Sequence, residues 1–156
     1  MDATYKTYYA SPIGLIELEG NEYALQALNF VQSKYVDHTQ QHPSLEPYVL
    51  QLDEYFQGKR REFEMNLVLN GTKFQQKVWE IVRQIPYGET RTYKDIALQF
   101  GNLKAIRAVG AANGKNKISI VIPCHRVIGS NGKLTGYAGG LWRKEWLLRH
   151  EGALLI

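Results

Sequence analysis

The chain has 156 residues, of which 44% are hydrophobic and 22% are charged, with a net charge of +4. This length and balance fit one folded domain or two small ones, and they exclude a disordered segment. No apolar run approaches the roughly 20 residues that span a bilayer, and the start lacks the pattern of a signal peptide. The single cysteine excludes an internal disulfide. We therefore expect a cytoplasmic protein with no membrane partner.

The charge is divided unevenly along the chain. Residues 1–69 hold 5 basic and 10 acidic side chains, whereas residues 70–156 hold 14 basic and 5 acidic ones, giving net charges of −5 and +9. A strongly basic half predicts a polyanionic partner, with nucleic acid as the leading candidate. Scattered lysines that only solvate a surface would give the same count, so charge alone leaves both interpretations open.

The first third of the chain is predicted to form a small sheet with one helix. Strand-forming residues are separated by turn residues at 11–14 and at Gly20-Asn21. A helix is predicted from Ser44 to Phe56, closed by Gly58, because apolar residues recur there at helical spacing. The predicted strands are residues 5–9, 15–19, 23–30 and 62–69.

No chemistry is evident in this first part. His38 and His42 have helical spacing, but they lie in a polar stretch without a nearby cysteine, so we expect no metal site. Asn70-Gly71 is predicted to separate an α/β domain of residues 1–69 from a mostly helical domain of residues 70–156.

The second domain is predicted to begin with three capped helices. Thr72 precedes a helix with an apolar face, and Thr92 precedes a short helix that ends at Gly101. Asn102 then precedes a helix that runs to about Asn113. Two short helices joined by a tight turn with a glycine are typical of a helix-turn-helix.

The second of these short helices is rich in small residues. Ala105, Ala108 and Gly110 allow close approach of another surface, and Lys104 and Arg107 add positive charge. Packing on a neighbouring helix explains the small residues about as well as DNA binding does. Long polar side chains that read base edges are scarce. The helix therefore either packs internally or lies against DNA with little sequence readout, which is compatible with a minor-groove approach.

Cys124 lies between Pro123 and His125-Arg126. A thiol pKa of about 8.5 falls beside a positive charge or a hydrogen-bonded base, which makes the sulfur a nucleophile near neutral pH. Pro123 fixes one backbone torsion, so we expect a rigid loop that follows a short strand. A lone cysteine is usually a small buried hydrophobe, and these residues alone favour that interpretation. The motifs elsewhere in the chain favour a nucleophilic cysteine instead.

Three features follow the cysteine. Asn131-Gly132 is a hairpin signal and a candidate wing, and residues 135–140 form a flexible loop that could close one wall of a pocket. Leu141–Glu151 is predicted to be the final helix, ending at Gly152. Glu151 is by default a solvated residue. A carboxylate is disfavoured at a helix C-terminus, however, which hints at a partner such as an imidazolium.

These residues resemble the O6-alkylguanine-DNA alkyltransferases, also called methylated-DNA-protein-cysteine methyltransferases. Pro123-Cys124-His125-Arg126-Val127 is similar to the acceptor motif of that family. The resemblance covers nearly all of residues 74–155 with consistent spacing and is weak before Gly71. Other matching segments are Thr92-Tyr93, residues 105–110, Asn116, residues 137–140, and residues 144–148 with Glu151.

The resemblance implies a direct repair of double-stranded DNA. A guanine that carries an O6-alkyl group is rotated out of the duplex, and the alkyl group moves irreversibly to Cys124, once per protein molecule. It also implies a ribonuclease H-like α/β first domain and a winged helix-turn-helix-like second domain. We expect a monomer that needs no cofactor and binds alkylated DNA with little sequence specificity.

The resemblance also assigns catalytic roles. Glu151 orients His125, and His125 takes the Cys124 proton through a water molecule. Asn116 braces the turn before the site and joins this network. Tyr93 donates its hydroxyl to guanine N3 and pushes on the flanking phosphate. Arg126 is more structural than catalytic.

The remaining roles concern DNA and the extruded base. Arg107 fills the gap that the base leaves, and the small residues of its helix lie along the minor groove. Backbone groups of Cys124 and Val127 accept hydrogen bonds from the exocyclic amine, and the Ala138 N–H reaches O6. The predicted DNA-binding residues are Tyr93, Lys104, Ala105, Arg107 and Ala108, and the predicted base-binding residues are Val127, Tyr137, Ala138 and Gly139.

The chain departs from the family pattern in two respects, and the sequence leaves two alternative functions. It lacks the cysteines with which some members bind zinc, and Ala138 stands where some members have a serine hydroxyl. A damage-binding module without a reactive thiol is one alternative, against which Cys124 argues. A DNA-binding regulator with a sensing cysteine is the other, and it would need a partner-binding region that the sequence does not reveal.

Overall fold

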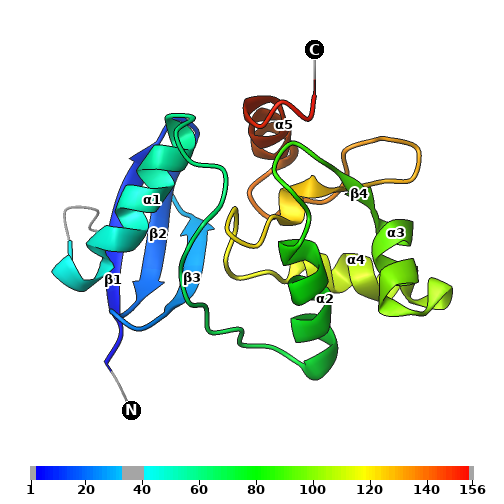
Figure 1. Cartoon of the computed structure of the whole chain (residues 1–156), viewed down its shortest axis with the longest axis horizontal. Helices are drawn as coiled ribbons and strands as arrows, with labels where there is room; N and C mark the ends of the chain where they lie inside the picture. The colour runs from blue at the N-terminus through cyan, green and yellow to red at the C-terminus, as the bar shows by residue number, and fades with distance from the viewer. Residues whose placement is uncertain (1–2, 33–40, 155–156) are drawn as a thin grey trace. The chain divides into compact units, whose positions relative to one another are not determined.

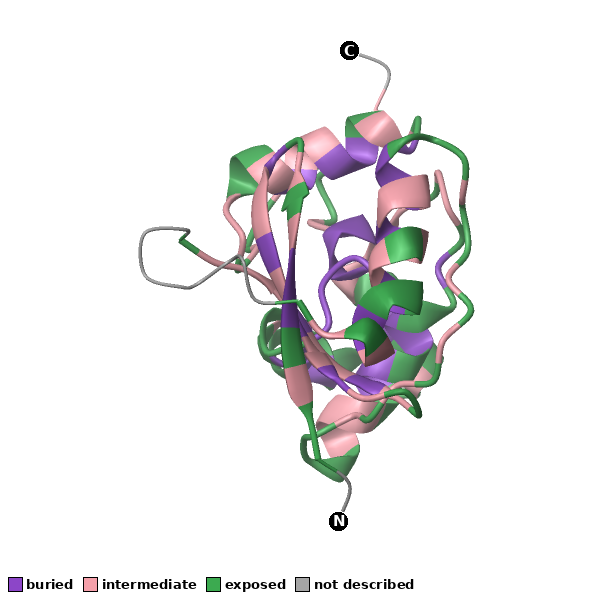
Figure 2. Ribbon diagram, turned by 90° about the vertical axis from the view of Figure 1, so that its left-hand side faces the viewer, coloured by how far each residue is buried: buried purple, intermediate pink, exposed green. Residues whose placement is uncertain are grey.

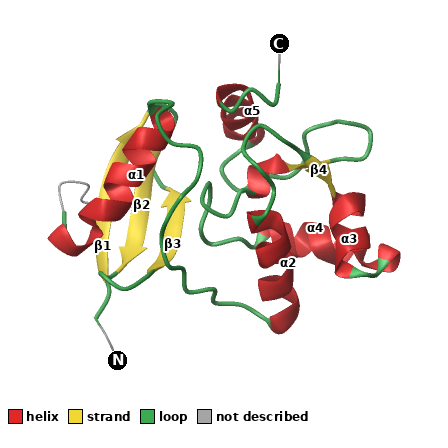
Figure 3. Ribbon diagram, viewed as in Figure 1, coloured by secondary structure: helices red, strands yellow, loops and turns green. Residues whose placement is uncertain are grey.

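The computed structural model describes residues 3–32 and 41–154. The chain forms two compact units, Met1–Leu69 and Asn70–Ile156. Figure 3 shows that the first unit contains the strands of a sheet, whereas the second is mainly helical, as the predicted fold class requires. None of the helices in the described ranges is long and apolar enough to cross a membrane.

The first unit contains a three-stranded antiparallel sheet in the order β1-β2-β3 (Figure 1). The strands are β1 (Tyr5–Ser11), β2 (Gly14–Gly20) and β3 (Leu25–Phe30). The turn between β1 and β2 closes with a 2.6 Å hydrogen bond from the Ser11 hydroxyl to the Gly14 carbonyl. Ile16 and Leu18 alternate on the fully buried face of β2. The helix α1 (Glu46–Phe56) lies beside this sheet and buries its own apolar face.

His42 has a structural role at the start of this helical segment. Its Nδ1 accepts a hydrogen bond from the Ser44 N–H at 3.2 Å, and its ring stacks on Tyr5 with 3.6 Å between centroids. His38 lies outside the described residues. Within those residues, no group of three His, Cys, Asp or Glu side chains is placed to hold a metal ion.

The predicted strand over residues 62–69 is wrong. Leu67 alone forms a bridge, to Leu25 of β3, and the rest of the segment is not strand. The Gln51 side chain satisfies both the N–H and the carbonyl of Glu64 at 2.9 Å. Because a side chain of α1 takes the backbone groups that a neighbouring strand would need, the alternating sequence does not build a fourth strand.

The described part of the second unit contains four α-helices, and the caps predicted at Thr72 and Thr92 are confirmed. Thr72 accepts from the Gln75 N–H, and Trp79 donates to the Ala112 carbonyl at 2.8 Å, which ties the first helix to the third. A short parallel pair of strands, β4 (Arg91–Thr92) and β5 (Val127–Ile128), joins the loops near the cysteine. The helices are α2 (Lys73–Arg83), α3 (Tyr93–Phe100), α4 (Ile106–Gly114) and α5 (Leu141–His150).

The helices α3 and α4 form the predicted helix-turn-helix (Figure 1). Thr92 and Asp95 make a reciprocal capping box at the start of α3. Gly101 ends α3 with φ of 97°, in the left-handed conformation that favours glycine. Asn102 then caps a short 3-10 turn that leads into α4.

The hairpin predicted at Asn131-Gly132 is not formed. The turn exists, and it is closed by a 2.9 Å hydrogen bond from the Gly129 N–H to the Lys133 carbonyl. The residues on either side do not pair with each other as strands, because Val127 and Ile128 pair in parallel with β4 instead. The candidate wing is therefore a loop.

The left-handed turn at Gly101 predicts a specific stability pattern. We expect Gly101→Ala to lower the free energy of unfolding by about 1 kcal/mol, because a Cβ atom disfavours this backbone conformation. Gly101→Asn should lose less, since asparagine tolerates it. Urea denaturation followed by tryptophan fluorescence reports on this unit, which contains Trp79, Trp142 and Trp146. Equal losses for both variants would contradict the assigned cause.

Candidate active site

The cysteine sits in a loop in which residues 118–127 are all buried; buried residues are drawn in purple in Figure 2. Asn116 holds this loop in shape. Its side chain donates to the Ile122 carbonyl at 2.9 Å and accepts from the Ile118 N–H at 3.0 Å. Ile120 adopts φ of 72°, which is strained for a β-branched residue and is stabilised by these surrounding bonds.

The strand predicted before the cysteine is not present. Residues 119–122 form turns, Cys124–Arg126 form one 3-10 turn, and the short strand β5 follows the cysteine instead. The reason is that the Ile122 N–H bonds back to the Ile118 carbonyl, so the chain folds on itself. The expectation of a rigid loop at Pro123 agrees with this arrangement.

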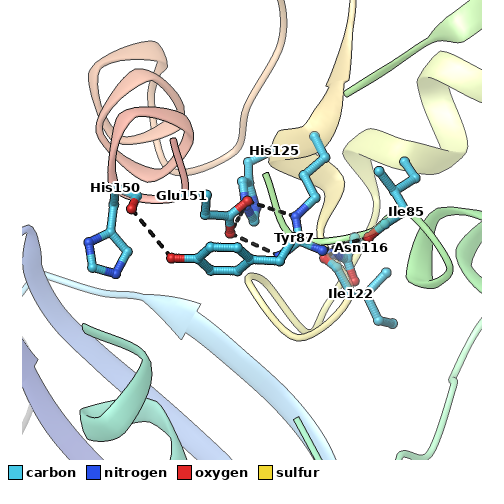
Figure 4. A network of polar contacts seen from close by, with 8 residues as sticks. Ile85, Tyr87, Asn116, Ile122, His125, His150 and Glu151 are labelled. Atoms are coloured by element: carbon cyan, nitrogen blue, oxygen red, sulfur yellow. Dashed lines mark hydrogen bonds and ion pairs between the residues drawn. The ribbon is translucent and has the colours of Figure 1, made fainter. Parts of the chain in front are cut away.

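Glu151 is the centre of a buried polar network (Figure 4). Its Oε2 lies 2.8 Å from His125 Nε2, and its Oε1 accepts from Arg126 Nε at 2.8 Å. A second guanidinium nitrogen reaches Oε2 at 3.0 Å, which makes the ion pair bidentate. Arg126 also donates to the Ile85 carbonyl at 2.6 Å. Glu151 is thus a partnered residue at the end of α5 and not a solvated one.

The protonation states follow from this geometry. Burial alone would raise the pKa of Glu151, but the His125 and Arg126 contacts outweigh it, so the pKa lies well below its usual range. Burial lowers the pKa of His125, which is 0% exposed and therefore neutral at pH 7. The Nε2–H donates to the Glu151 carboxylate, so Nδ1 carries the free lone pair. Nδ1 is buried and has no hydrogen-bond partner among the described residues.

The expected lowering of the Cys124 pKa is not found. Burial raises the pKa of the thiol, and the Asn116 amide, the Lys144 charge and nearby backbone N–H groups oppose this effect only in part. The sulfur is in a residue that is 7% exposed, so desolvation of a thiolate dominates. In the closed site Cys124 is a protonated thiol beside a neutral imidazole.

A small pocket lies over Cys124. Its free volume is about 10 Å³, enough for one water molecule and too little for a purine base. Residues 136–138 of the closing loop (residues 135–140) form one wall. The pocket is lined by Asn113, Gly114, Asn116, Ser119, Cys124, Gly136, Tyr137 and Ala138.

Lys144 holds the closing loop in place through hydrogen bonds to backbone carbonyls. It is 0% exposed, and its ammonium group donates to the Val127 carbonyl at 2.6 Å and to the Thr135 carbonyl at 2.7 Å. Burial lowers the pKa of Lys144 to about 8, and a thiolate at Cys124 would oppose this effect. One buried cation therefore links the cysteine loop, the closing loop and α5.

The structure brings only some of the predicted residues to this pocket. Cys124, Asn116, Tyr137 and Ala138 line it, and His125 with Glu151 forms the buried network behind the cysteine. Gly139 does not line it, and its carbonyl accepts from Arg143 at 2.8 Å.

The other predicted residues lie outside the pocket. Tyr93 points its hydroxyl at the closing loop, 3.2 Å from the Thr135 carbonyl. Lys104, Arg107 and Ala108 are exposed on the helix-turn-helix, whereas Ala105 is only 9% exposed and offers little side-chain surface to a partner.

Two site residues escaped the sequence analysis as functional groups. Asn113 lies one helical turn after the buried Val109 on α4, and Lys144 lies one turn before the buried Leu148 on α5. The available signal was therefore a polar residue on the apolar face of an amphipathic helix. The Tyr137 hydroxyl is a further buried polar group in the pocket.

Fold and site together define a helix-turn-helix protein whose chemistry resides in one buried thiol. The family described as "6-O-methylguanine DNA methyltransferase, DNA binding domain" matches residues 73–153, and "6-O-methylguanine DNA methyltransferase, ribonuclease-like domain" matches residues 4–69. The chain belongs to the 6-O-methylguanine DNA methyltransferase family. The ribonuclease-like description also confirms the predicted class of the first domain.

Relatives and solved structures agree with this membership. The methylated-DNA–protein-cysteine methyltransferase of Methanosarcina acetivorans is 47% identical, over 96% of this chain and 99% of the relative. That of Mycolicibacterium paratuberculosis is 49% identical, over 93% of each. The crystal structure of Mycobacterium tuberculosis O6-methylguanine methyltransferase has a TM-score of 0.86 at 44% identity, covering 97% of this chain and 94% of that one. A complex of the M. tuberculosis protein with DNA has a TM-score of 0.86 at 46% identity, covering 95% and 92%.

The bidentate ion pair at Arg126 predicts a large contribution to stability. We expect Arg126→Met to lower the free energy of unfolding by about 3–5 kcal/mol, because Glu151 would remain buried without its main cation. Arg149→Met is the matched control. Its partner Glu145 lies one turn away, and both side chains are more than 40% exposed, so the loss should stay below about 0.5 kcal/mol. Similar losses in the two variants would contradict a structural role for Arg126.

The buried neutral His125 predicts a pH dependence of stability. Its pKa in the folded protein lies below the ordinary value of about 6.5, so the unfolded chain binds the extra proton first as the pH falls. The free energy of unfolding should therefore decrease as the pH drops through 6.5. Urea unfolding between pH 8 and 5 measures this slope. His125→Asn should flatten it, and an unchanged slope in that variant would refute the assignment.

Proposed function

We propose that this chain is a methylated-DNA–protein-cysteine methyltransferase that repairs O6-methylguanine in double-stranded DNA. The observation that carries the proposal is Cys124 at the base of a pocket, beside a neutral His125 that Glu151 holds with its Nδ1 lone pair free. Relatives that are nearly half identical over almost the whole chain carry this name. Family membership and site chemistry therefore support the same reaction.

In the proposed reaction the Cys124 sulfur attacks the alkyl carbon of the lesion. His125 Nδ1 accepts the thiol proton through a water molecule, which the space over the cysteine can hold. The carbon–sulfur bond forms as the carbon–O6 bond breaks, and the electron pair leaves with the guanine. The Tyr93 hydroxyl donates a hydrogen bond to guanine N3 and stabilises the departing anion, and the proton that His125 took from the thiol finally neutralises the released guanine. A thioether offers no easy return path, so each molecule acts once.

The reaction requires the damaged base to leave the duplex. Cys124 is 7% exposed, and the pocket is too small for a base, so both the base and the closing loop have to move. We propose that the exposed Arg107 on α4 fills the gap in the duplex. The exposed Ala108 beside it lets the helix approach the minor groove closely, and Lys104 adds a phosphate contact.

The cellular setting follows from the same chemistry. The reacting thiol has to remain free, which a reducing cytoplasm favours. Every residue of the network and the pocket comes from the second unit of a single chain, so we propose that the protein acts as a monomer. The excess of positive charge lies in residues 70–156, which include the helix-turn-helix that would contact DNA.

The test is the intact mass of the protein after incubation with a duplex that contains O6-methylguanine. We expect a gain of one methyl group, about 14 Da, located on Cys124 by peptide mapping, because the acceptor is the enzyme's own nucleophile. Cys124→Ala should bind the same duplex and gain no mass. Transfer by this variant would overturn the assigned acceptor. Tight binding of the lesion without any mass change in the native chain would indicate a damage-binding module instead.

A further inference from the structure

Asn113, in the last turn of α4, presents an unusual polar group to the pocket. The residue is 4% exposed and lines the pocket together with Cys124. Its Nδ2 donates to the Cys124 carbonyl at 3.3 Å. Its Oδ1 is buried and has no hydrogen-bond partner within the part of the chain that the structure describes. Buried acceptors without partners are rare in folded proteins and lower stability. A donor from a bound molecule would satisfy this one.

The orientation of the Asn113 amide is determined by its neighbour. The Cys124 carbonyl can only accept, so the amide nitrogen has to face it. Rotating the amide by half a turn would place two acceptors against each other. The Oδ1 atom is therefore an acceptor held in the pocket by the same loop that carries the reacting sulfur.

An O6-alkylated guanine has one hydrogen-bond donor on its base. Alkylation at O6 removes the hydrogen from N1, so N1, N3, N7 and O6 can only accept, and the 2-amino group alone donates. Two backbone acceptors are candidates for this amine, the carbonyls of Cys124 and Val127. Each already accepts one hydrogen bond, from Asn113 Nδ2 and from the Lys144 ammonium group at 2.6 Å, and each keeps a second lone pair. The amine has two hydrogens, and Asn113 Oδ1 is a buried acceptor of the pocket with no partner among the described residues, so it can accept beside these carbonyls.

We propose that Asn113 Oδ1 accepts a hydrogen bond from the 2-amino group of the extruded guanine and makes the pocket selective for that base. This inference rests on the function proposed above. Because α4 also carries Arg107, one rigid helix would contact the duplex at its start and read the extruded base at its end. Asn113 would be a specificity residue that positions the base and takes no part in proton transfer.

The test compares methyl transfer from two duplexes that differ only in the 2-amino group. One contains O6-methylguanine and the other O6-methylhypoxanthine, and the rate constant is measured for the native protein and for Asn113→Leu. In the native protein we expect loss of the amine to slow transfer about tenfold, since a buried acceptor is then left unpaired. In Asn113→Leu the ratio of the two rate constants should fall towards one.

A matched control and a second variant make the outcome decisive. Ser119→Ala changes another buried polar residue of the same pocket and should leave the ratio at its native value. Asn113→Ala replaces the leucine variant if that protein does not fold. Iodoacetamide labelling of Cys124 without DNA tests whether loss of the Cys124 carbonyl contact has altered the thiol itself.

The possible failures are distinguishable. No transfer from O6-methylguanine by the native protein would refute the proposed function. Transfer with the same rate ratio in the native protein and in the Asn113 variants would refute only the role of Asn113. A native protein that alkylates equally fast from both duplexes would also refute that role.

Discussion

The buried carboxylate of Glu151 is the interaction on which the second unit depends. Removing a carboxylate from water is unfavourable, and it is offset here by a bidentate Arg126 and by His125 Nε2. The same charge has two consequences. It joins the end of α5 to the cysteine loop, and through the hydrogen bond to Nε2 it selects the imidazole tautomer with a free Nδ1. Stability and, in the proposed reaction, general-base chemistry therefore depend on the same residue.

A second constraint is that the thiol is buried before any substrate arrives. Burial raises the pKa of Cys124, so the sulfur is held as a thiol, which is a weak nucleophile towards small alkylating agents in solution. The closing loop, held by Lys144 through the carbonyls of Val127 and Thr135, maintains this state. Under the proposed single-turnover reaction this protection has a use, because reaction with anything other than the lesion would consume the molecule.

Local sequence signals predicted the parts of this structure that depend on local physics. Helix caps at Thr72 and Thr92 and the left-handed glycine at Gly101 involve neighbours in the chain, and they are found as predicted. Of the residues that the family motif predicted for the site, Cys124, Asn116, Tyr137 and Ala138 line the pocket, whereas Gly139 does not. The strand at residues 62–69 and the lowered thiol pKa were wrong because each depends on distant groups. The Gln51 side chain decides the first and burial of the loop the second.

Two polar residues of this chain occupy helix positions at which the sequence periodicity predicts an apolar residue. Asn113 interrupts the buried face of α4, and Lys144 interrupts that of α5, although an apolar residue at either position would fit the pattern better. Each loses hydration on folding, so each needs a compensating contact. The Lys144 ammonium group donates to backbone carbonyls within the unit, whereas Asn113 Oδ1 has no hydrogen-bond partner among the described residues. Lys144 therefore completes the fold, whereas in the role proposed for Asn113 the remaining partner is the bound base.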